Sequence, residues 1–222
     1  MTSISLQDFE RYSSKRAVQA SLLRAKISEE GTYEEFVGQL YDDIDQLIYR
    51  MQSGPELRQT DSEDRLSADV LGGLNIFGYD AVADGKTGGH VDLSVKMGEF
   101  SWIGEAKKDG NFYEGFLQLT TRYVPASGNF AHNQSGLIFY LVATPDARGK
   151  LTTWRDNLTS KGHACVDCAR NPLAFYSDHT VESSGTVFKV RTMGVALYHK
   201  PKDKSARNSA AKKAAKKAVV GK

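Results

Sequence analysis

Hydrophobic residues recur along this 222-residue chain with two different periods, and these periods predict a mixture of helices and strands. Between residues 33 and 51 they recur every three or four positions, which predicts an amphipathic helix. Thr32 and Glu35 have the spacing of a capping box at the start of this helix. A weaker helical pattern over residues 17–27 precedes it, so we expect an N-terminal helical region.

The middle of the chain predicts six elements in the order helix, three strands, helix and strand. We expect these elements at residues 61–76, 79–83, 91–97, 100–107, 111–123 and 137–143. Beyond them the pattern predicts a helix over residues 147–160, then a loop. A terminal hairpin of residues 187–191 and 195–198 is expected to turn at residues 192–194, which end in glycine.

The two central strands alternate between hydrophobic and polar residues, which sends their polar side chains to one shared face. Residues 98–99, a glycine and a glutamate, suit a two-residue turn with glycine at the first central position. A hairpin closed there pairs Met97 with Phe100 and places Asp92 directly opposite Glu105. Facing carboxylates repel each other unless a cation lies between them. The pattern therefore predicts a site for Mg²⁺ or Mn²⁺, and the alternative is an exposed polar face.

Two further residues bring charge to the same place. Lys107 lies two positions after Glu105 and therefore points to the same side of its strand. Glu63 falls on the stripe of its helix that holds the hydrophobic residues, so it is expected to face the sheet. Asp64 is the alternative acid, and a capping role for Glu63, three residues after Thr60, is the competing interpretation.

The sequence Glu105-Ala106-Lys107, preceded by Asp92 and by an acidic helix, resembles the motif of the PD-(D/E)xK nuclease superfamily. The resemblance covers residues 61–143 and includes the order of the elements. It implies an α/β fold with a restriction-endonuclease-like core, in which a mixed central sheet (α-β-β-β-α-β) is flanked by helices. It also implies Mg²⁺-dependent hydrolysis of phosphodiester bonds.

The resemblance further implies a role for each matching residue. The metal ligands would be Asp92, Glu105, Glu63 and the carbonyl of Ala106. Lys107 would position or deprotonate the attacking water. Gln118 on the following helix and Lys108 beside the motif would contact nucleic acid. Some relatives carry Gln-x-x-x-Tyr on that helix, whereas here Arg122 takes the fourth position and Tyr123 follows.

Composition divides the chain into an N-terminal helical extension (1–55), a nuclease-like domain (56–199) and a basic tail (200–222). The tail holds nine of the 29 Lys and Arg residues and one of the 27 acidic residues, so the remainder is acidic overall. Its low-complexity Ala/Lys sequence predicts a disordered segment. Such a tail adds salt-sensitive affinity for phosphate groups, or it is a solubilising end.

The cysteines and the N-terminus indicate the cellular setting. Two cysteines are too few for a disulfide framework, the first residues lack a signal-peptide pattern, and no apolar run is long enough to span a bilayer. We therefore expect a cytoplasmic protein without a membrane partner. His163, Cys165, Cys168 and His179 have the side-chain types of a zinc site, but a second closely spaced pair is missing, so Zn²⁺ is not expected there.

Together these features predict a Mg²⁺-dependent nuclease, with DNA favoured over RNA by the resemblance and by the basic tail. Restriction, phage defence and DNA repair are settings that suit such an enzyme. One alternative is a nuclease-fold protein that binds nucleic acid without cutting it. Another is a partner-binding protein that assembles, for example as a homodimer, through its N-terminal helices.

Overall fold

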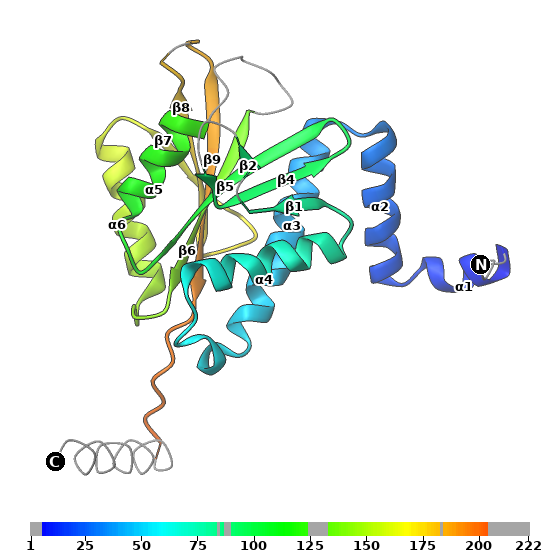
Figure 1. Cartoon of the computed structure of the whole chain (residues 1–222), viewed down its shortest axis with the longest axis horizontal. Helices are drawn as coiled ribbons and strands as arrows, with labels where there is room; N and C mark the ends of the chain where they lie inside the picture. Colours follow the sequence, from blue (N-terminus) through cyan, green and yellow to red (C-terminus); the bar gives the residue numbers. More distant parts are fainter. Residues whose placement is uncertain (1–5, 84, 87–89, 124–132, 183, 204–222) are drawn as a thin grey trace.

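The computed structural model describes residues 6–83, 85–86, 90–123, 133–182 and 184–203. It has an α/β architecture in which a mixed seven-stranded sheet is flanked by helices (Figure 1). The strands of this sheet are β1 (Asp80–Val82), β4 (Leu93–Met97), β5 (Phe100–Lys108), β6 (Gln134–Leu141), β7 (Ala164–Asp167), β8 (Ala174–Thr180) and β9 (Val187–Ala196). Two short strands, β2 (Gly85–Lys86) and β3 (His90–Val91), pair with each other.

The strand order in the sheet is β1-β4-β5-β6-β9-β8-β7. The pairs β5–β6 and β6–β9 are parallel, and the other neighbouring strands are antiparallel. The parallel strands therefore form the centre of the sheet. Parallel strands are normally buried on both faces, which agrees with the continuous hydrophobic run predicted for β6.

Helices lie on both sides of the sheet, with α3 and α4 on one side and α5 and α6 on the other (Figure 1). The helical elements are α1 (Leu6–Ser13), α2 (Arg16–Glu30), α3 (Tyr33–Gln52), α4 (Glu63–Ile76), α5 (Phe112–Gln118) and α6 (Ala147–Ser160). A 3₁₀ turn, η1 (Pro55–Arg58), precedes α4, and a π-helical turn, η2 (Leu119–Tyr123), continues α5.

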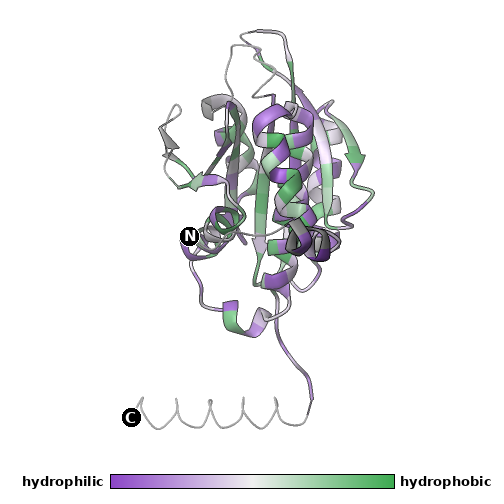
Figure 2. Ribbon diagram, turned by 90° about the vertical axis from the view of Figure 1, so that its right-hand side faces the viewer, coloured by the Kyte–Doolittle hydropathy of each residue, from purple (hydrophilic) through white to green (hydrophobic). Residues whose placement is uncertain are grey.

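Each face of the sheet has its own hydrophobic core, because successive side chains of a strand point to opposite faces. Ile138 and Tyr140 of β6 pack on the side of α3 and α4, whereas Leu137 and Phe139 pack on the side of α5 and α6. Figure 2 shows hydrophobic residues along the strands between the helical layers. The prediction that this strand is buried on both faces is confirmed.

Helix α3 belongs to the main core, although the sequence suggested that it forms part of an extension. Phe36, Leu40 and Ile44 on its inner face are completely buried against the sheet and α4. The predicted capping box is confirmed, since the Thr32 hydroxyl accepts from the Glu35 N–H and the Glu35 carboxylate accepts from the Thr32 N–H at 2.8 Å. Helix α3 therefore belongs to the helical layer that covers one face of the sheet.

Helices α1 and α2 project from the side of the molecule opposite α5 and α6 (Figure 1). Helix α2 is attached through Ile27, which enters the core, and through Arg24, whose Nη1 donates to Asp43 Oδ1 at 3.0 Å. The Tyr79 hydroxyl donates to the same carboxylate at 2.7 Å, so this buried charge has a cation and a second donor. Leu22 of α2 remains exposed.

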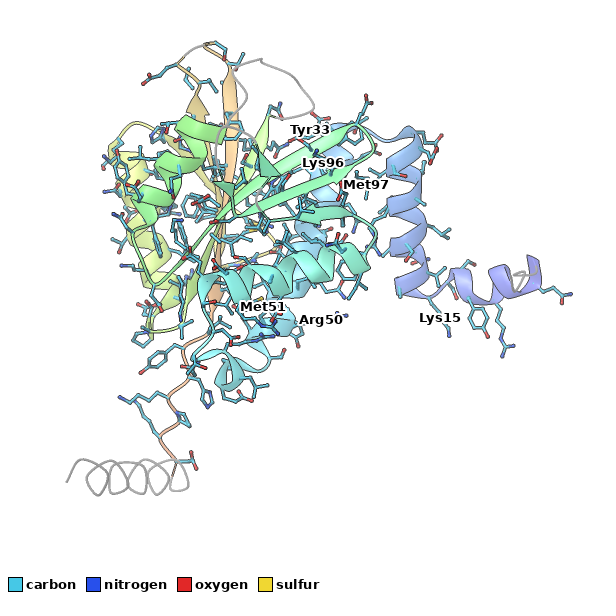
Figure 3. The ribbon with its side chains drawn as sticks, in the orientation of Figure 1. Lys15, Tyr33, Arg50, Met51, Lys96 and Met97 are labelled. Carbon is cyan, nitrogen blue, oxygen red and sulfur yellow. The ribbon has the colours of Figure 1, made fainter. Side chains whose placement is uncertain are left out.

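The predicted turn of the central hairpin is confirmed. Met97 pairs with Phe100, and Gly98 has a φ of 58°, which its position in this type of turn requires. The turn lies toward the start of α3, where the rings of Tyr33 and Phe100 are 6.1 Å apart and where Lys96 is also found (Figure 3). This register determines the positions of Asp92 and Glu105 at the other end of the hairpin.

The competing interpretation of Glu63, as the partner of Thr60 in a capping box, is contradicted by the structure. Helix α4 begins at Glu63, and its N-cap is Ser62, whose hydroxyl accepts from the Arg65 N–H at 3.1 Å. Serine can fill this position because its oxygen reaches the third backbone N–H of the helix. The Glu63 side chain is therefore not needed for capping and extends toward β5 instead.

The predicted terminal hairpin was wrong, because β9 runs without interruption from Val187 to Ala196. The segment expected to turn, Thr192–Gly194, lies beside β6 with Gly194 paired to Phe139. Glycine allows close packing here, since a Cβ at Gly194 would lie 2.4 Å from Leu151 Cδ1 of α6 and the leucine side chain would have to move. The antiparallel partner of β9 is β8, in a region expected to be a loop.

Within the described ranges, no helix is long and apolar enough to cross a lipid bilayer. Residues 204–222, most of the predicted basic tail, lie outside the described residues.

Candidate active site

The end of strand β5 carries two of the predicted residues on the face toward α5. Glu105 is buried, with 2% of its surface exposed, and Lys107 is half-buried. Residues 103–108 of this strand also pair with β6, so both side chains stand within the sheet and not at its edge. The strand thereby holds a carboxylate and an ammonium group in a region largely closed off by protein.

The Lys107 ammonium group is the centre of a cluster of three acids. Its Nζ lies 2.6 Å from Glu105 Oε1 and 3.8 Å from both Glu63 Oε1 and Asp92 Oδ2. The acids come from β5, from the start of α4 and from a bend between β3 and β4. Four residues predicted from sequence as one site are therefore brought together by the fold.

Asp92 lies just beyond the last pair of the hairpin, in which Leu93 faces Gly104. Its Oδ2 accepts a hydrogen bond from the Ala106 N–H at 2.8 Å, which fixes the carboxylate against β5. The predicted register is thus correct, and Asp92 comes next to Glu105 through a bend and not through a ladder pair. Such a bend frees the carboxylate to turn toward Lys107.

Glu63, at the start of α4, is tied to the end of β5. Its Oε2 accepts from the Lys108 N–H at 2.5 Å, and the Lys108 Nζ donates to the Asp61 carbonyl at 2.5 Å. The Lys108 ammonium, which the sequence assigned to substrate binding, is therefore engaged in holding the residues before α4. Asp64, the alternative acid, is exposed and makes no such contact with β5 in the described part of the chain.

Gly115 of α5 is a site residue that the sequence analysis missed. A Cβ at this position would lie 2.8 Å from Lys107 Cγ, 3.2 Å from Lys107 Cε and 3.5 Å from Glu105 Cγ. Glycine therefore lets α5 pack directly on the two side chains. The available signal was a glycine within a predicted helix, where it lowers helix stability and so suggests a packing requirement.

Burial and neighbouring charges shift the pKa values of the cluster. Burial raises the pKa of Glu105 to about 7. The negative charge of Asp92 raises this pKa further, whereas the hydrogen bond from Lys107 lowers it. Burial also raises the pKa of Glu63, although the hydrogen bond from Lys108 opposes this. Burial lowers the pKa of Lys107, but its hydrogen bond to Glu105 and the surrounding carboxylates outweigh burial and raise it. Such shifted values are common where groups exchange protons or bind charged ligands.

The cluster offers oxygen ligands of the kind that Mg²⁺ and Mn²⁺ prefer. Glu105 Oε2 is buried and accepts no hydrogen bond from any described residue, so one carboxylate oxygen is free for an ion. Within the described part of the chain, no three Asp, Glu, His or Cys side chains are already arranged as ligands of one ion. An ion at Glu105 Oε1 would compete with the Lys107 ammonium group, which bonds that oxygen at 2.6 Å.

A cavity of about 350 Å³ opens beside the acids. Its lining residues are Glu63, Asp64, Ser67, Ala68, Leu71, Ala83, Val91 and Asp92. Two of the three clustered carboxylates thus border an open space, which gives water and a substrate a route to them. The negative charge of this wall also favours cations there.

Gln118 lies one turn after Gly115 on α5, and its Oε1 is buried without a hydrogen-bond partner among the described residues. Its expected contact with nucleic acid remains a prediction.

The cysteine and histidine residues of the possible zinc site are divided between the two faces of the sheet. Cys168 lies in the core beside α3 and accepts from Arg191 Nη2 at 3.6 Å, whereas Cys165 packs on the opposite core. His179 Nδ1 and His163 Nδ1 are 3.0 Å apart and hydrogen-bonded. Both rings pack against Phe116 of α5, His179 is buried and His163 half-buried, and the pair does not include either cysteine.

His179 is expected to make the fold sensitive to acid. Burial and the neighbouring His163 lower the pKa of His179 to about 3, so the folded protein keeps it neutral while the unfolded chain takes up a proton near pH 6.5. Stability contributed by neutral His179 is complete above pH 6.5 and is lost progressively as pH falls toward 3, by at most about 1.4 kcal/mol per pH unit. Urea unfolding at pH 7 and pH 5 measures this loss. A His179→Gln protein should lose less stability between the two pH values, and an equal loss in both proteins would contradict the assignment.

Comparison with models of known protein families, with curated protein sequences and with solved structures finds no match for this chain. The nuclease resemblance therefore rests on the motif and the order of the elements.

Proposed function

We propose that this protein is a Mg²⁺-dependent nuclease that hydrolyses phosphodiester bonds at the Lys107 cluster. The observation that carries the proposal is the presence of three carboxylates within 4 Å of one lysine ammonium group, from β5, α4 and the bend before β4. A structural ion pair needs one carboxylate for one lysine. Three acids around one cation leave an excess of negative charge, which suits a site that also binds a metal ion.

Asp92, Glu105, Glu63 and the carbonyl of Ala106 are the residues we assign to the ion. When bound, Mg²⁺ would act as a Lewis acid on the phosphodiester. The raised pKa of Lys107 keeps its ammonium group charged at neutral pH, so it is suited to stabilise negative charge that develops on the phosphate. Removal of a proton from water by Lys107 is less favoured, because that requires the neutral amine.

DNA is the substrate that we propose first, on the basis of the family resemblance and the basic composition of residues 200–222. The competing function is binding of nucleic acid without cleavage. It is favoured by one observation, namely that the Lys107 ammonium group occupies the space between the acids and bonds Glu105.

The purified 222-residue chain is expected to cut nucleic acid when a divalent ion is present, because the excess negative charge of the carboxylate cluster calls for a cation. Supercoiled plasmid, linear duplex DNA, single-stranded DNA and RNA would be incubated with Mg²⁺, Mn²⁺ or EDTA, at low and at moderate salt. Gel analysis should show products with Mg²⁺ or Mn²⁺, no products with EDTA, and less cutting at higher salt.

The two functions give opposite results in this experiment. Cleavage that depends on the divalent ion supports the nuclease. Binding without cleavage would be supported if the protein slows the migration of the nucleic acid in a gel-shift measurement while all four substrates stay intact in Mg²⁺ and Mn²⁺.

A further inference from the structure

A second cavity, of about 390 Å³, lies between α5 and α6, beyond the end of β5. Its lining residues are Gly110, Asn111, Phe112, Tyr113, Lys150, Thr153, Trp154, Asn157 and Lys161. The lining contains two lysines, three aromatic residues and no acidic residue. Its volume is within the range of small-molecule binding sites, and its charge is opposite to that of the cavity beside the acids.

The floor of this cavity is made of fixed aromatic rings. Phe112 stacks on Phe139 of β6 with 3.6 Å between ring centroids and an interplanar angle of 3°, and Trp154 meets Phe112 edge-on at 6.3 Å. Phe112 and Trp154 are each 6% exposed, so the surrounding core holds both rings in place. The Trp154 Nε1–H is buried and has no acceptor among the described residues.

The rim carries two lysines over aromatic faces. Lys161 Nζ lies 4.5 Å from the centre of the Tyr113 ring, and Lys150 Nζ lies 5.4 Å from the centre of the Phe112 ring. Both lysines are exposed, and neither forms an ion pair with a described residue. Tyr113 is 39% exposed, so a flat ligand that displaces Lys161 from its ring finds an aromatic face and a nearby cation.

We propose that this cavity receives one unpaired nucleotide of the nucleic acid on which the protein acts. The base would stack on Tyr113, and Lys150 and Lys161 would bind the adjoining phosphates. Aromatic rings combined with free lysines suit single-stranded nucleic acid, because every base offers a stacking face and every linkage carries a negative charge. The inference rests on the proposed nuclease function and deepens it, since it assigns a substrate with an unpaired strand.

The position of the cavity agrees with such a role. Asn111 and Gly110 of its lining directly follow the segment from Glu105 to Lys108 that carries the candidate active site. Gly115 of α5 faces Lys107, whereas Tyr113 faces Lys161 at the end of α6. The two sites are therefore on opposite flanks of one short helix, and a strand that passes the start of α5 would contact both.

Binding measurements without divalent ions test this cavity separately from cleavage. Fluorescence anisotropy would follow binding of the 222-residue chain, in EDTA, to a labelled 12-nucleotide oligothymidylate and to a labelled duplex of equal length. Tyr113→Ala and the double variant Lys150→Ala/Lys161→Ala are each expected to weaken single-strand binding by about tenfold, with a smaller effect on the duplex. Tyr113→Trp should retain the wild-type affinity, because it keeps a stacking face.

Matched controls remove a lysine and a tyrosine elsewhere. Lys96, in the hairpin far from α5 and α6 (Figure 3), and Tyr49, which is 71% exposed on α3, would be replaced by alanine. Circular dichroism would verify that every variant is folded. Thymidine 5′-phosphate as competitor should displace the oligonucleotide at lower concentration than inorganic phosphate, since only the nucleotide has a base to stack.

The possible results separate this inference from the nuclease proposal. The inference would be overturned if the cavity variants bind single-stranded DNA as tightly as the Lys96→Ala and Tyr49→Ala controls do. This holds even if the wild-type protein cuts DNA. Cavity-dependent binding combined with no cleavage in Mg²⁺ or Mn²⁺ would overturn the nuclease and retain a nucleotide-binding cavity. Absence of any oligonucleotide binding in EDTA would overturn the inference, while the cleavage assay with Mg²⁺ or Mn²⁺ would still decide the nuclease proposal.

Discussion

Replacement of Lys107 by methionine is expected to abolish divalent-dependent cleavage and to destabilise the fold. Cleavage should fall by at least about 10²-fold, because one group that stabilises charge in a transition state commonly contributes that much. The free energy of unfolding should fall by about 3 kcal/mol, since Glu105 would stay buried beside Asp92 without its cation at 2.6 Å. Initial rates of plasmid cleavage and urea unfolding at pH 8 measure the two effects.

A second substitution separates stability from activity. Glu105→Gln removes the buried negative charge, so the double variant Glu105→Gln/Lys107→Met should regain much of the lost stability while remaining inactive. Lys96→Met is the matched control, because Lys96 is exposed on β4, and it should change neither quantity. A Lys107→Met protein that cuts DNA at the wild-type rate would show that the active site lies elsewhere.

Gly115→Ala is expected to reduce cleavage strongly while leaving the protein folded. The added Cβ would lie 2.8 Å from Lys107 Cγ, so α5 or the lysine side chain must move. A displacement of catalytic groups by about 1 Å costs on the order of 10²-fold in rate. The stability change should be small, because alanine improves helix propensity by about 1 kcal/mol and offsets part of the strain.

The matched control for this prediction is Gly72→Ala. Gly72 lies in helix α4, is exposed and has open space around its Cβ position, so its replacement should stabilise the protein slightly without a change in rate. Cleavage rates and thermal unfolding of the two variants measure the contrast. Equal rates for Gly115→Ala and wild type would mean that the contact between α5 and Lys107 has no part in catalysis.

The hairpin shows how far local sequence patterns determine this fold. A two-residue turn with glycine at its first position pairs Met97 with Phe100, and the period of two then carries the register to Asp92 and Glu105. Both rules concern residues that are neighbours in sequence or directly across a turn. The amphipathic pattern of α3 and the buried pattern of β6 were predictable for the same reason.

The terminal strands show where these patterns fail. A glycine inside an alternating run is compatible with a turn or with close packing against another element. The contact of Gly194 with Leu151 of α6 decides between them, and those residues are 43 positions apart. Strand β8 was missed because it carries polar residues, among them His179, which is buried and contacts His163 and Phe116 from distant segments.

By itself, the sequence determined the mixed α/β class, the order of the elements from α4 to β6, and three charged residues of the candidate site, namely Asp92, Glu105 and Lys107. The tertiary structure decided which helix acid joins the site, since Glu63 reaches the Lys108 N–H at 2.5 Å while Asp64 stays exposed. It also decided that Gly115 closes the site from α5. The positions of Glu63 and Gly115 depend on contacts between segments that are distant in the sequence. The packing of helices on both faces of the sheet sets the geometry of these contacts, and no local hydrophobic period encodes it.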